Sequence, residues 1–265
     1  MTYFIADLCS NWGGDLSVAL DMIGSAADAG FDAVKVQAIR PHAMWRPGDP
    51  RIEQHSHLEL SWHEVGMLAH EAQRNNLDFG VSVFDVGDVR EAIHRADYLK
   101  VASCESMWAP LVAAVADSGA DWAISTPPGW ASPLPPNQNT DWMRNLVCRM
   151  HCIPQYPCPV RDVNLARLDG IRHEVDPGCT LVGYSDHTAD IDVVAQAVAW
   201  YDAEAVELHW SSDYVCPEDP HSWDGPSFEQ LQRSILAVFE CSGLEAGPRH
   251  ECWETMARDN EGWRR

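Results

Sequence analysis

The sequence carries little positive charge for its size. Of its 265 residues, 18 are Lys or Arg and 40 are Asp or Glu, so the formal net charge is −22. This balance argues against a nucleic-acid partner, because nucleic acids bind to basic surfaces. It also repels small anions at long range, so a site for an anionic substrate must supply its own local cations.

Long apolar runs are also missing. No 18 consecutive residues are all apolar, which argues against a membrane span. The first residues lack the basic region and cleavage site of a signal peptide, so we expect a cytoplasmic protein. The nine cysteines include no repeated C-x-x-C pair and no complete set of zinc ligands. We therefore expect reduced thiols, most of them buried.

Lysine is almost absent. The chain has sixteen Arg but only two Lys, Lys35 and Lys100. Since Arg has replaced Lys nearly everywhere, a remaining Lys indicates a position that needs a compact ammonium group. Chance is the alternative explanation, and the location of the two residues helps to decide between them.

Short apolar runs alternate with amphipathic stretches along the whole chain, which predicts alternating strands and helices. The helices have end signals, including a capping box from Ser61 to Glu64, N-caps at Asp15 and Asp190, and a C-cap at Gly30. The predicted strands are 4–8, 33–37, 78–82, 98–102, 122–125, 146–151, 180–184 and 205–209. The predicted helices are 16–29, 62–75, 86–95, 110–118, 163–175, 191–201 and 228–241.

Eight strands in strict alternation with helices favour a single-domain α/β fold, the (β/α)8 TIM barrel, over an open sheet. We expect the barrel to span residues 1–243 and residues 244–265 to form a short polar tail. Residues 127–140 contain five prolines, so we expect a long loop there in place of a regular helix.

Active-site residues of such barrels lie at the carboxyl ends of the strands. Both lysines fall at these positions, which weakens the chance explanation. Ammonium groups and short hydroxyl donors suit phosphate and carboxylate oxygens, so the sequence predicts a pocket for a small phosphorylated carboxylate. The expected binding residues are Lys35, Ser82, Lys100, Ser103, Ser125 and Ser185. A lone serine at a strand end is more often a turn former, so this prediction depends on the whole group.

His187 and His209 follow neighbouring strands, so their imidazoles should meet at one rim. Two neutral imidazoles suit a divalent transition metal with open positions for water and substrate. The alternative for either residue alone is a hydrogen-bonded rim histidine. Asp7, Glu105 and Asp219 are carboxylates near the same rim that could orient hydroxyls or move a proton, although each alone is more often a solvated or ion-paired side chain.

Several ordered motifs resemble the sialic acid synthase family, which includes the N-acetylneuraminate, legionaminate and pseudaminate synthases. Residues 5–8 and 11–16 are similar to its opening IAEIG…NHNGDL, residues 29–37 to AGADAVKFQ, and residues 100–105 to KIASGE. Residues 125–126 match the start of STG, and residues 151–165 resemble HCTSEYPAP…DVNL. Residues 182–188 are identical to VGYSDHT, and residues 207–210 are like EKHF.

This resemblance implies a metal-assisted condensation of phosphoenolpyruvate with an aldehyde acceptor, such as an open-chain sugar. The product would be a 2-keto-3-deoxy acid, with phosphate released. His187 and His209 would hold the metal, with Mn²⁺ first and Mg²⁺ or Co²⁺ as alternatives. The predicted anion pocket would bind phosphoenolpyruvate, and Glu105 would lie near the reacting carbons. The residues implied to face the acceptor are Asp7, Gln37, Tyr156 and Asp219.

The chain also departs from the family pattern. Asp7 stands where the family has Glu, and Trp12 replaces the His of NHNG. The sequence stops after the barrel, so we expect the family's C-terminal antifreeze-like domain to be absent and any homodimer to use a barrel face. We therefore expect a different acceptor, with a flatter or more aromatic part that contacts Trp12, Trp130 or Trp210.

Two other functions stay open at this point. The first is a metal-dependent barrel lyase or aldolase that acts on another small carboxylate. The second is a barrel that binds or scaffolds without catalysis, in which replacing both lysines and both rim histidines would leave function untouched. Phosphate release from phosphoenolpyruvate across a panel of aldehydes separates the synthase from both.

Overall fold

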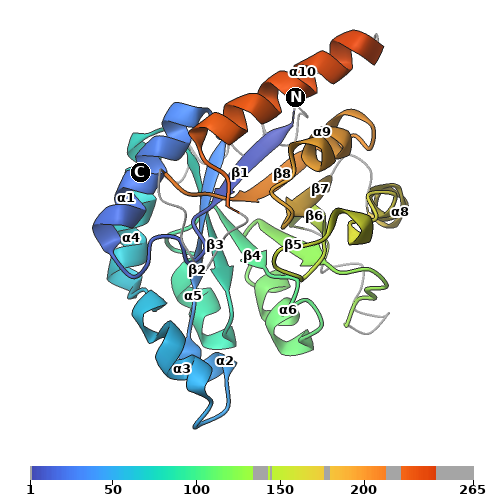
Figure 1. The fold of residues 1–265 in the computed structure, drawn as a ribbon. Helices are drawn as coiled ribbons and strands as arrows, with labels where there is room; N and C mark the ends of the chain where they lie inside the picture. The colour runs from blue at the N-terminus through green and yellow to red at the C-terminus, as the bar shows by residue number, and fades with distance from the viewer. Residues whose placement is uncertain (1, 134–142, 144, 176–179, 213–221, 243–265) are drawn as a thin grey trace.

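The computed structural model describes residues 2–133, 143, 145–175, 180–212 and 222–242. Eight parallel strands form a closed barrel in chain order, with β8 paired to β1, as the sequence predicts. Figure 1 shows the strands at the centre of the molecule with the helices around them. The strands are β1 (Tyr3–Asp7), β2 (Ala33–Ala38), β3 (Asp78–Val83), β4 (Tyr98–Val101), β5 (Trp122–Thr126), β6 (Leu146–Cys152), β7 (Leu181–Asp186) and β8 (Ala205–His209).

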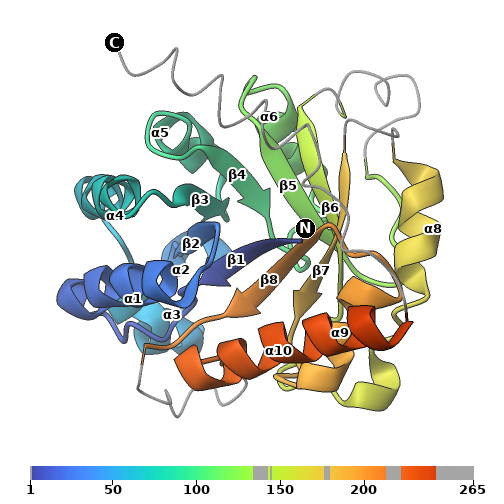
Figure 2. The same ribbon diagram turned by 90° about the horizontal axis from the view of Figure 1, so that it is seen from above.

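The helices form the outer layer. After β8 the long helix α10 packs against α9 and α1, which closes the ring of helices (Figure 2). None of the described helices is long and apolar enough to cross a membrane. The α-helices are α1 (Leu16–Ala29), α2 (Pro41–Met44), α3 (Pro50–His55), α4 (Trp62–Arg74), α5 (Val89–Ala92), α6 (Ala109–Ala116), α8 (Arg167–Glu174), α9 (Ile191–Ala199) and α10 (Gly225–Ser242). Short 3₁₀ turns are η1 (Ser56–Leu58), η2 (Val86–Asp88) and η4 (Val160–Asp162).

The predicted helix ends are confirmed where polar caps define them. Ser61 and Glu64 form the reciprocal capping box, and Asp15 and Asp190 accept hydrogen bonds from the first backbone N–H groups of α1 and α9. Gly30 ends α1 with φ 94°, a left-handed conformation that glycine adopts without a side-chain clash.

Two helix predictions were too long at their starts. Asn164 has φ 51°, which an α-helix cannot include, so the helix predicted from residue 163 begins at Arg167. Asp85 accepts a hydrogen bond from the backbone N–H of Gly87 at 2.7 Å and starts a 3₁₀ turn, so the helix predicted from residue 86 begins at Val89. The short helices α2 and α3, both in the connection from β2 to α4, were not predicted.

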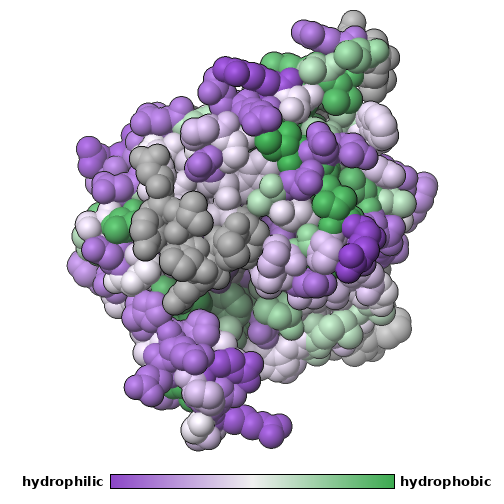
Figure 3. Space-filling view, viewed as in Figure 1, coloured by the Kyte–Doolittle hydropathy of each residue, from purple (hydrophilic) through white to green (hydrophobic). Residues whose placement is uncertain are grey.

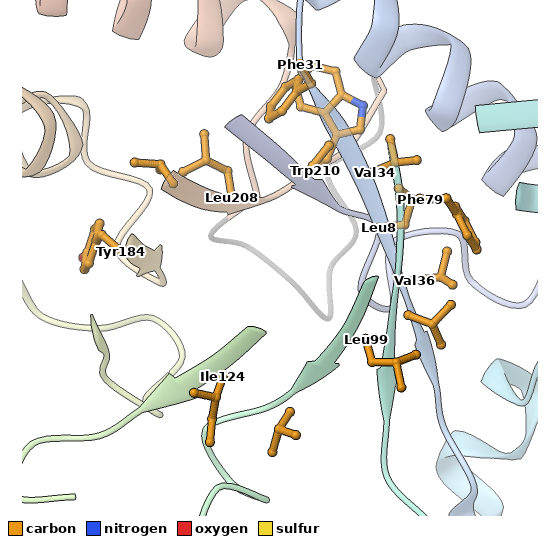
Figure 4. Packing of buried hydrophobic residues seen from close by; sticks show 14 of the residues in the cluster. Leu8, Phe31, Val34, Val36, Phe79, Leu99, Ile124, Tyr184, Leu208 and Trp210 are labelled. Atoms are coloured by element: carbon orange, nitrogen blue, oxygen red, sulfur yellow. The ribbon is translucent and has the colours of Figure 1, made fainter. Parts of the chain in front are cut away.

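Hydrophobic packing outside the barrel fixes the strands against the helices. Figure 4 shows buried side chains from several strands, among them Val34, Leu99 and Ile124, which lie along the barrel wall. Phe31 and Trp210 meet edge to face with ring centroids 4.9 Å apart. The face of the molecule shown in Figure 3 is mostly hydrophilic with small hydrophobic areas, in keeping with the strong net charge. The predicted tail at 244–265 lies outside the described residues, as does the second half of the proline-rich segment, residues 134–140.

Candidate active site

The site follows from the alternation of side chains along each strand, which sends every second residue into the barrel. The amino-terminal half of the interior is filled by a cluster that includes Tyr3, Ile5, Tyr98 and Met150. Gly80 leaves room for the Tyr98 ring, because a Cβ at residue 80 would overlap that ring. One step further along the strands the inward-facing residues become polar, so the interior is apolar at one end and charged at the other.

A pocket opens at the carboxyl ends of the strands. Most of the predicted site residues line it, which means that side chains spread over 200 positions of sequence meet in one place. The lining residues are Asp7, Lys35, Gln37, Lys100, Ala102, Ser103, Ser125, Cys152, Tyr156, Ser185, His187, Glu207 and His209. A wider hollow outside the barrel, lined in part by Trp62 and His70, contains none of the predicted site residues.

Three predicted residues are not in this lining. Ser82 is level with Gln37 and Lys100 in the strand register and accepts a hydrogen bond from Lys35 at 2.9 Å. Glu105 lies in the turn between β4 and α6, where burial raises the pKa of its carboxyl group. Asp219 falls outside the described residues.

Two buried lysines and two buried carboxylates form the floor of the pocket. The ammonium nitrogen of Lys35 lies 2.6 Å from an Asp7 oxygen and 3.8 Å from Glu207, while that of Lys100 lies 2.7 Å from Glu207. All four side chains are at most 6% exposed. Their formal charges sum to zero, because each ammonium group has a carboxylate partner. The sequence predicted the cations but not this neutralisation.

The ion pairs shift the ionisation of both partners. Burial alone would lower the pKa of Lys35, but the nearby Asp7 and Glu207 carboxylates raise it above the usual lysine value. Burial alone would likewise raise the pKa of Glu207, but Lys100 and Lys35 lower it to about 2. Lys35 and Glu207 therefore both stay charged at neutral pH.

Hydrogen-bond donors remain for an anion. Ser125 Oγ is buried and has no hydrogen-bond partner among the described residues, although it lines the pocket. An ammonium group has three donors, and Lys100 directs two of them at Glu207 and the Met150 sulfur. Ser185 donates to Glu207 at 3.1 Å. A buried polar atom without a partner is costly, so Ser125 indicates that a ligand atom belongs beside it.

The two predicted metal-binding imidazoles are neighbours. The ring centroids of His187 and His209 are 5.2 Å apart, and both side chains are buried. His187 Nδ1 lies 2.7 Å from the carbonyl oxygen of Ile153, which can only accept, so Nδ1 carries the proton and Nε2 presents its lone pair. This is the tautomer that a metal ligand needs. No cluster of three or more His, Cys, Asp or Glu side chains suited to a metal occurs in the described part of the chain. Within the described ranges, the protein would thus supply two ligands and leave the other positions open.

Two further side chains border the imidazoles. The Tyr156 ring lies 4.1 Å from the His187 ring and 5.8 Å from the His209 ring by centroid, with the side chain 55% exposed. The Cys152 sulfur lies 3.8 Å from His187 Nδ1. Burial raises the pKa of this thiol, which keeps it protonated.

The prediction that Trp12, Trp130 or Trp210 meets the acceptor is not supported, because none of them lines the pocket. All three rings are at least nine-tenths buried. Trp210 packs against Phe31 outside the barrel and donates from its indole to Ser25. The hydrophobic effect, which buries large rings between strands and helices, accounts for these positions.

Ala102, Cys152 and Glu207 are the pocket residues to which the sequence assigned no role. Glu207 follows the same inward alternation as Ala205 and His209, so its direction was predictable. Its pairing with both lysines was not predictable, because this contact depends on where β8 lies relative to β2 and β4 across the barrel.

Comparison with known proteins agrees with the motifs. Residues 22–246 match the model of the NeuB family. The chain belongs to this family. Over 270 residues it is 28% identical to human N-acetylneuraminate-9-phosphate synthase, covering 91% of this chain and 71% of that protein. It is 26% identical over 260 residues to N,N'-diacetyllegionaminic acid synthase of Legionella pneumophila, covering 88% of this chain and 71% of that protein.

The fold has a solved counterpart in the same group. The crystal structure of N-acetylneuraminic acid synthetase from Leptospira borgpetersenii in complex with citrate superposes with a TM-score of 0.81 at 26% identity. The match covers 100% of this chain and 93% of that chain. The expected resemblance to sialic acid synthases is thus confirmed, and the chain is a NeuB-family barrel of the sugar-acid synthase type.

Proposed function

We propose that this NeuB-family protein condenses phosphoenolpyruvate with an aldehyde to give a 2-keto-3-deoxy acid and inorganic phosphate. One observation carries the proposal: the only two lysines of a chain with net charge −22 lie together with two imidazoles around one pocket. The names of the relatives, which make sialic and legionaminic acids, favour an N-acylated amino sugar as the acceptor class.

The residues of the pocket would hold the phosphate and carboxylate groups. Lys100 and the hydroxyls of Ser103 and Ser125 offer donors around the same space, and the Ser185 hydroxyl would join them by turning its proton from Glu207 to the anion. Charge-assisted bonds of this kind are about twice as strong as neutral ones. Lys35 is held from behind by Ser82 and from the side by Asp7, so its ammonium group is fixed in place before a substrate arrives. Fixed donors lower the cost of orienting the substrate.

In the proposed reaction, carbon 3 of phosphoenolpyruvate forms a bond to the aldehyde carbon, and the aldehyde oxygen gains a proton. Water adds at carbon 2, and phosphate leaves from that carbon to give the keto group. The buried floor of the pocket limits the entry of other water molecules. Gln37, which donates to Asp7 at 3.1 Å, and the exposed Tyr156 border the pocket and would contact the acceptor.

A divalent cation held by His187 and His209 would supply Lewis-acid polarisation of the aldehyde oxygen. The tautomer of His187 and the closeness of the two rings fit this group. We propose Mn²⁺ first, with Mg²⁺ and Co²⁺ as alternatives.

The test is phosphate release from phosphoenolpyruvate with a panel of N-acyl hexosamines and simple aldoses, each assayed with Mn²⁺, Mg²⁺ and Co²⁺. We expect release that requires both phosphoenolpyruvate and one of the aldehydes, together with a new keto acid of the summed carbon skeleton. The variant Lys100→Met should remove the release, while the surface variant Arg95→Met should retain it. No release with any aldehyde would reject the proposal.

A further inference from the structure

Asp186, the last residue of β7, has a buried carboxylate, and both of its oxygens accept hydrogen bonds. It is 1% exposed and lies on the outer side of the barrel wall. Its Oδ1 accepts from the Tyr184 hydroxyl at 3.0 Å and from the backbone N–H and hydroxyl of Thr188 at 3.1 and 2.7 Å. Its Oδ2 accepts from the backbone N–H of Ala189 at 2.9 Å and from the indole N–H of Trp223 at 3.2 Å.

Trp223 connects this carboxylate to the end of β8. Its backbone N–H donates to the carbonyl oxygen of His209 at 2.7 Å, and its own carbonyl oxygen accepts from Ser211 at 2.8 Å. The indole ring is 1% exposed, so these contacts are sealed from solvent. One residue therefore holds the backbone at His209 and, through its side chain, the carboxylate next to His187.

Strand pairing alone does not set the position of His187. The ladder between β7 and β8 ends at the pair Asp186 and Leu208, one residue before the imidazole. The chain then turns, and Ala189 takes φ 51°, which a residue with a side chain adopts only when its surroundings hold it there. His209, in contrast, is still paired with Asp7 of β1. The bonds of His187 to Ile153 and Cys158 link it to the segment after β6, and not to β8, which carries His209.

An ordinary capping role for Asp186 explains only part of its contacts. A carboxylate that closes the turn before α9 would need the N–H groups of Thr188 and Ala189. It would not need an indole 37 positions further along the chain. The hydrogen bond from the Trp223 indole links the two segments that carry the imidazoles, and a local cap does not require it.

We propose that Asp186 and Trp223 are positioning residues that hold His187 and His209 at the separation required by one divalent cation. This inference rests on the metal-binding part of the proposed function. Groups that orient metal ligands from behind typically change metal affinity 10–100-fold when they are removed. We expect an effect of that size from losing the indole N–H alone.

The test compares Mn²⁺ dissociation constants, measured by calorimetric titration, for the native protein, Trp223→Phe and Trp130→Phe. Phenylalanine keeps most of the buried ring in both variants but removes the N–H. Trp130 is the matched control, since its indole also donates one buried hydrogen bond, to the Ser106 carbonyl oxygen at 3.0 Å, and it does not line the pocket. We expect Trp223→Phe to weaken Mn²⁺ binding by about 10–100-fold and Trp130→Phe to leave it unchanged.

A second pair of variants tests the carboxylate in the same way. Asp186→Asn cannot accept from both Ala189 and Trp223 while also accepting from Thr188, so we expect weaker Mn²⁺ binding. Asp190→Asn is its control, because the Asp190 carboxylate caps α9 by accepting from the backbone N–H groups of Asp192 and Val193, and asparagine is also a good cap. Circular dichroism at the titration temperature establishes that each variant is folded.

A readout without metal completes the experiment. Long-range ¹H–¹⁵N spectra of the metal-free protein report the tautomer and surroundings of each imidazole. We expect the His187 and His209 signals to move in Trp223→Phe and to stay in place in Trp130→Phe. Equal Mn²⁺ affinities and unmoved imidazole signals in Trp223→Phe would overturn the positioning role while leaving the synthase proposal intact. Failure of phosphate release, with Mn²⁺ binding lost only in Trp223→Phe and Asp186→Asn, would reject the synthase and support the positioning role.

Discussion

The Glu207 carboxylate lies 2.7 Å from the ammonium group of Lys100, and the two form a buried ion pair in the pocket floor. Glu207 also faces Lys35 at 3.8 Å, while Asp7 pairs with Lys35 from the other side. Because these charges cancel, the pocket has no surplus cation of its own for a substrate with several negative charges. Both the stability of the pocket and its anion affinity should depend on this balance.

Removing one partner of the buried pair should destabilise the fold. We expect Glu207→Gln to lower the free energy of unfolding by about 3 kcal/mol, because Lys100 then keeps a buried charge without its partner. The double variant Lys100→Met/Glu207→Gln should cost less than the sum of the two single variants, because neither charge is left alone. Urea unfolding measures all three. Glu229→Gln, which breaks the exposed pair with Arg233, is the control and should change stability by less than about 0.5 kcal/mol. Additive single effects would contradict this coupling.

Lys100 should also contribute directly to anion affinity. We expect Lys100→Ala to weaken phosphoenolpyruvate binding by about 2 kcal/mol or more, which is roughly 30-fold, if the ammonium group contacts the desolvated anion. Calorimetric titration with phosphoenolpyruvate gives the dissociation constant. Arg95→Ala removes a cation from the outer surface and should have no effect. An unchanged dissociation constant in Lys100→Ala would place the anion elsewhere.

Much of this site could be predicted from the sequence because the barrel is built from a repeating unit. Each strand appears as a short apolar run, and closure of the barrel brings the strand ends together, so Lys35, Lys100 and His209 were expected at one rim before any geometry was known. The short helices α2 and α3 escaped prediction because α3 buries no side chain and α2 buries only Pro41, so neither has an apolar repeat.

The positions of the tryptophan rings and the ion-pair partners of Glu207 could not be predicted from the sequence. A large ring near a strand end can lie in the pocket or between strand and helix, and the sequence does not distinguish the two. Trp210 lies between strand and helix because it packs there in an aromatic cluster with Phe31 and Phe228. The pairing of Glu207 with both lysines crosses the barrel, and contacts between strands that are not neighbours leave no local pattern.

The two imidazoles should be required together for metal binding. We expect His187→Ala and His209→Ala each to abolish Mn²⁺ binding, since the described residues offer no third His, Cys, Asp or Glu ligand arranged to compensate. Calorimetric titration of the purified variants measures the loss. His70→Ala, which alters the outer hollow, should bind Mn²⁺ like the native protein. Native affinity in either rim variant would remove that histidine from the metal site.

The balanced charges of the pocket floor predict that metal and anion bind cooperatively. With Lys35, Lys100, Asp7 and Glu207 summing to zero, a divalent cation near His187 would supply the positive charge that favours the anion. We expect Mn²⁺ to tighten phosphoenolpyruvate binding by at least about 10-fold, and by linkage the anion must tighten Mn²⁺ binding by the same factor. Titrations in both orders measure the two factors. In His209→Ala the Mn²⁺ effect on anion affinity should vanish. Equal phosphoenolpyruvate affinity with and without Mn²⁺ in the native protein would mean that the lysines alone provide the attraction and that their carboxylate partners move away when the anion binds.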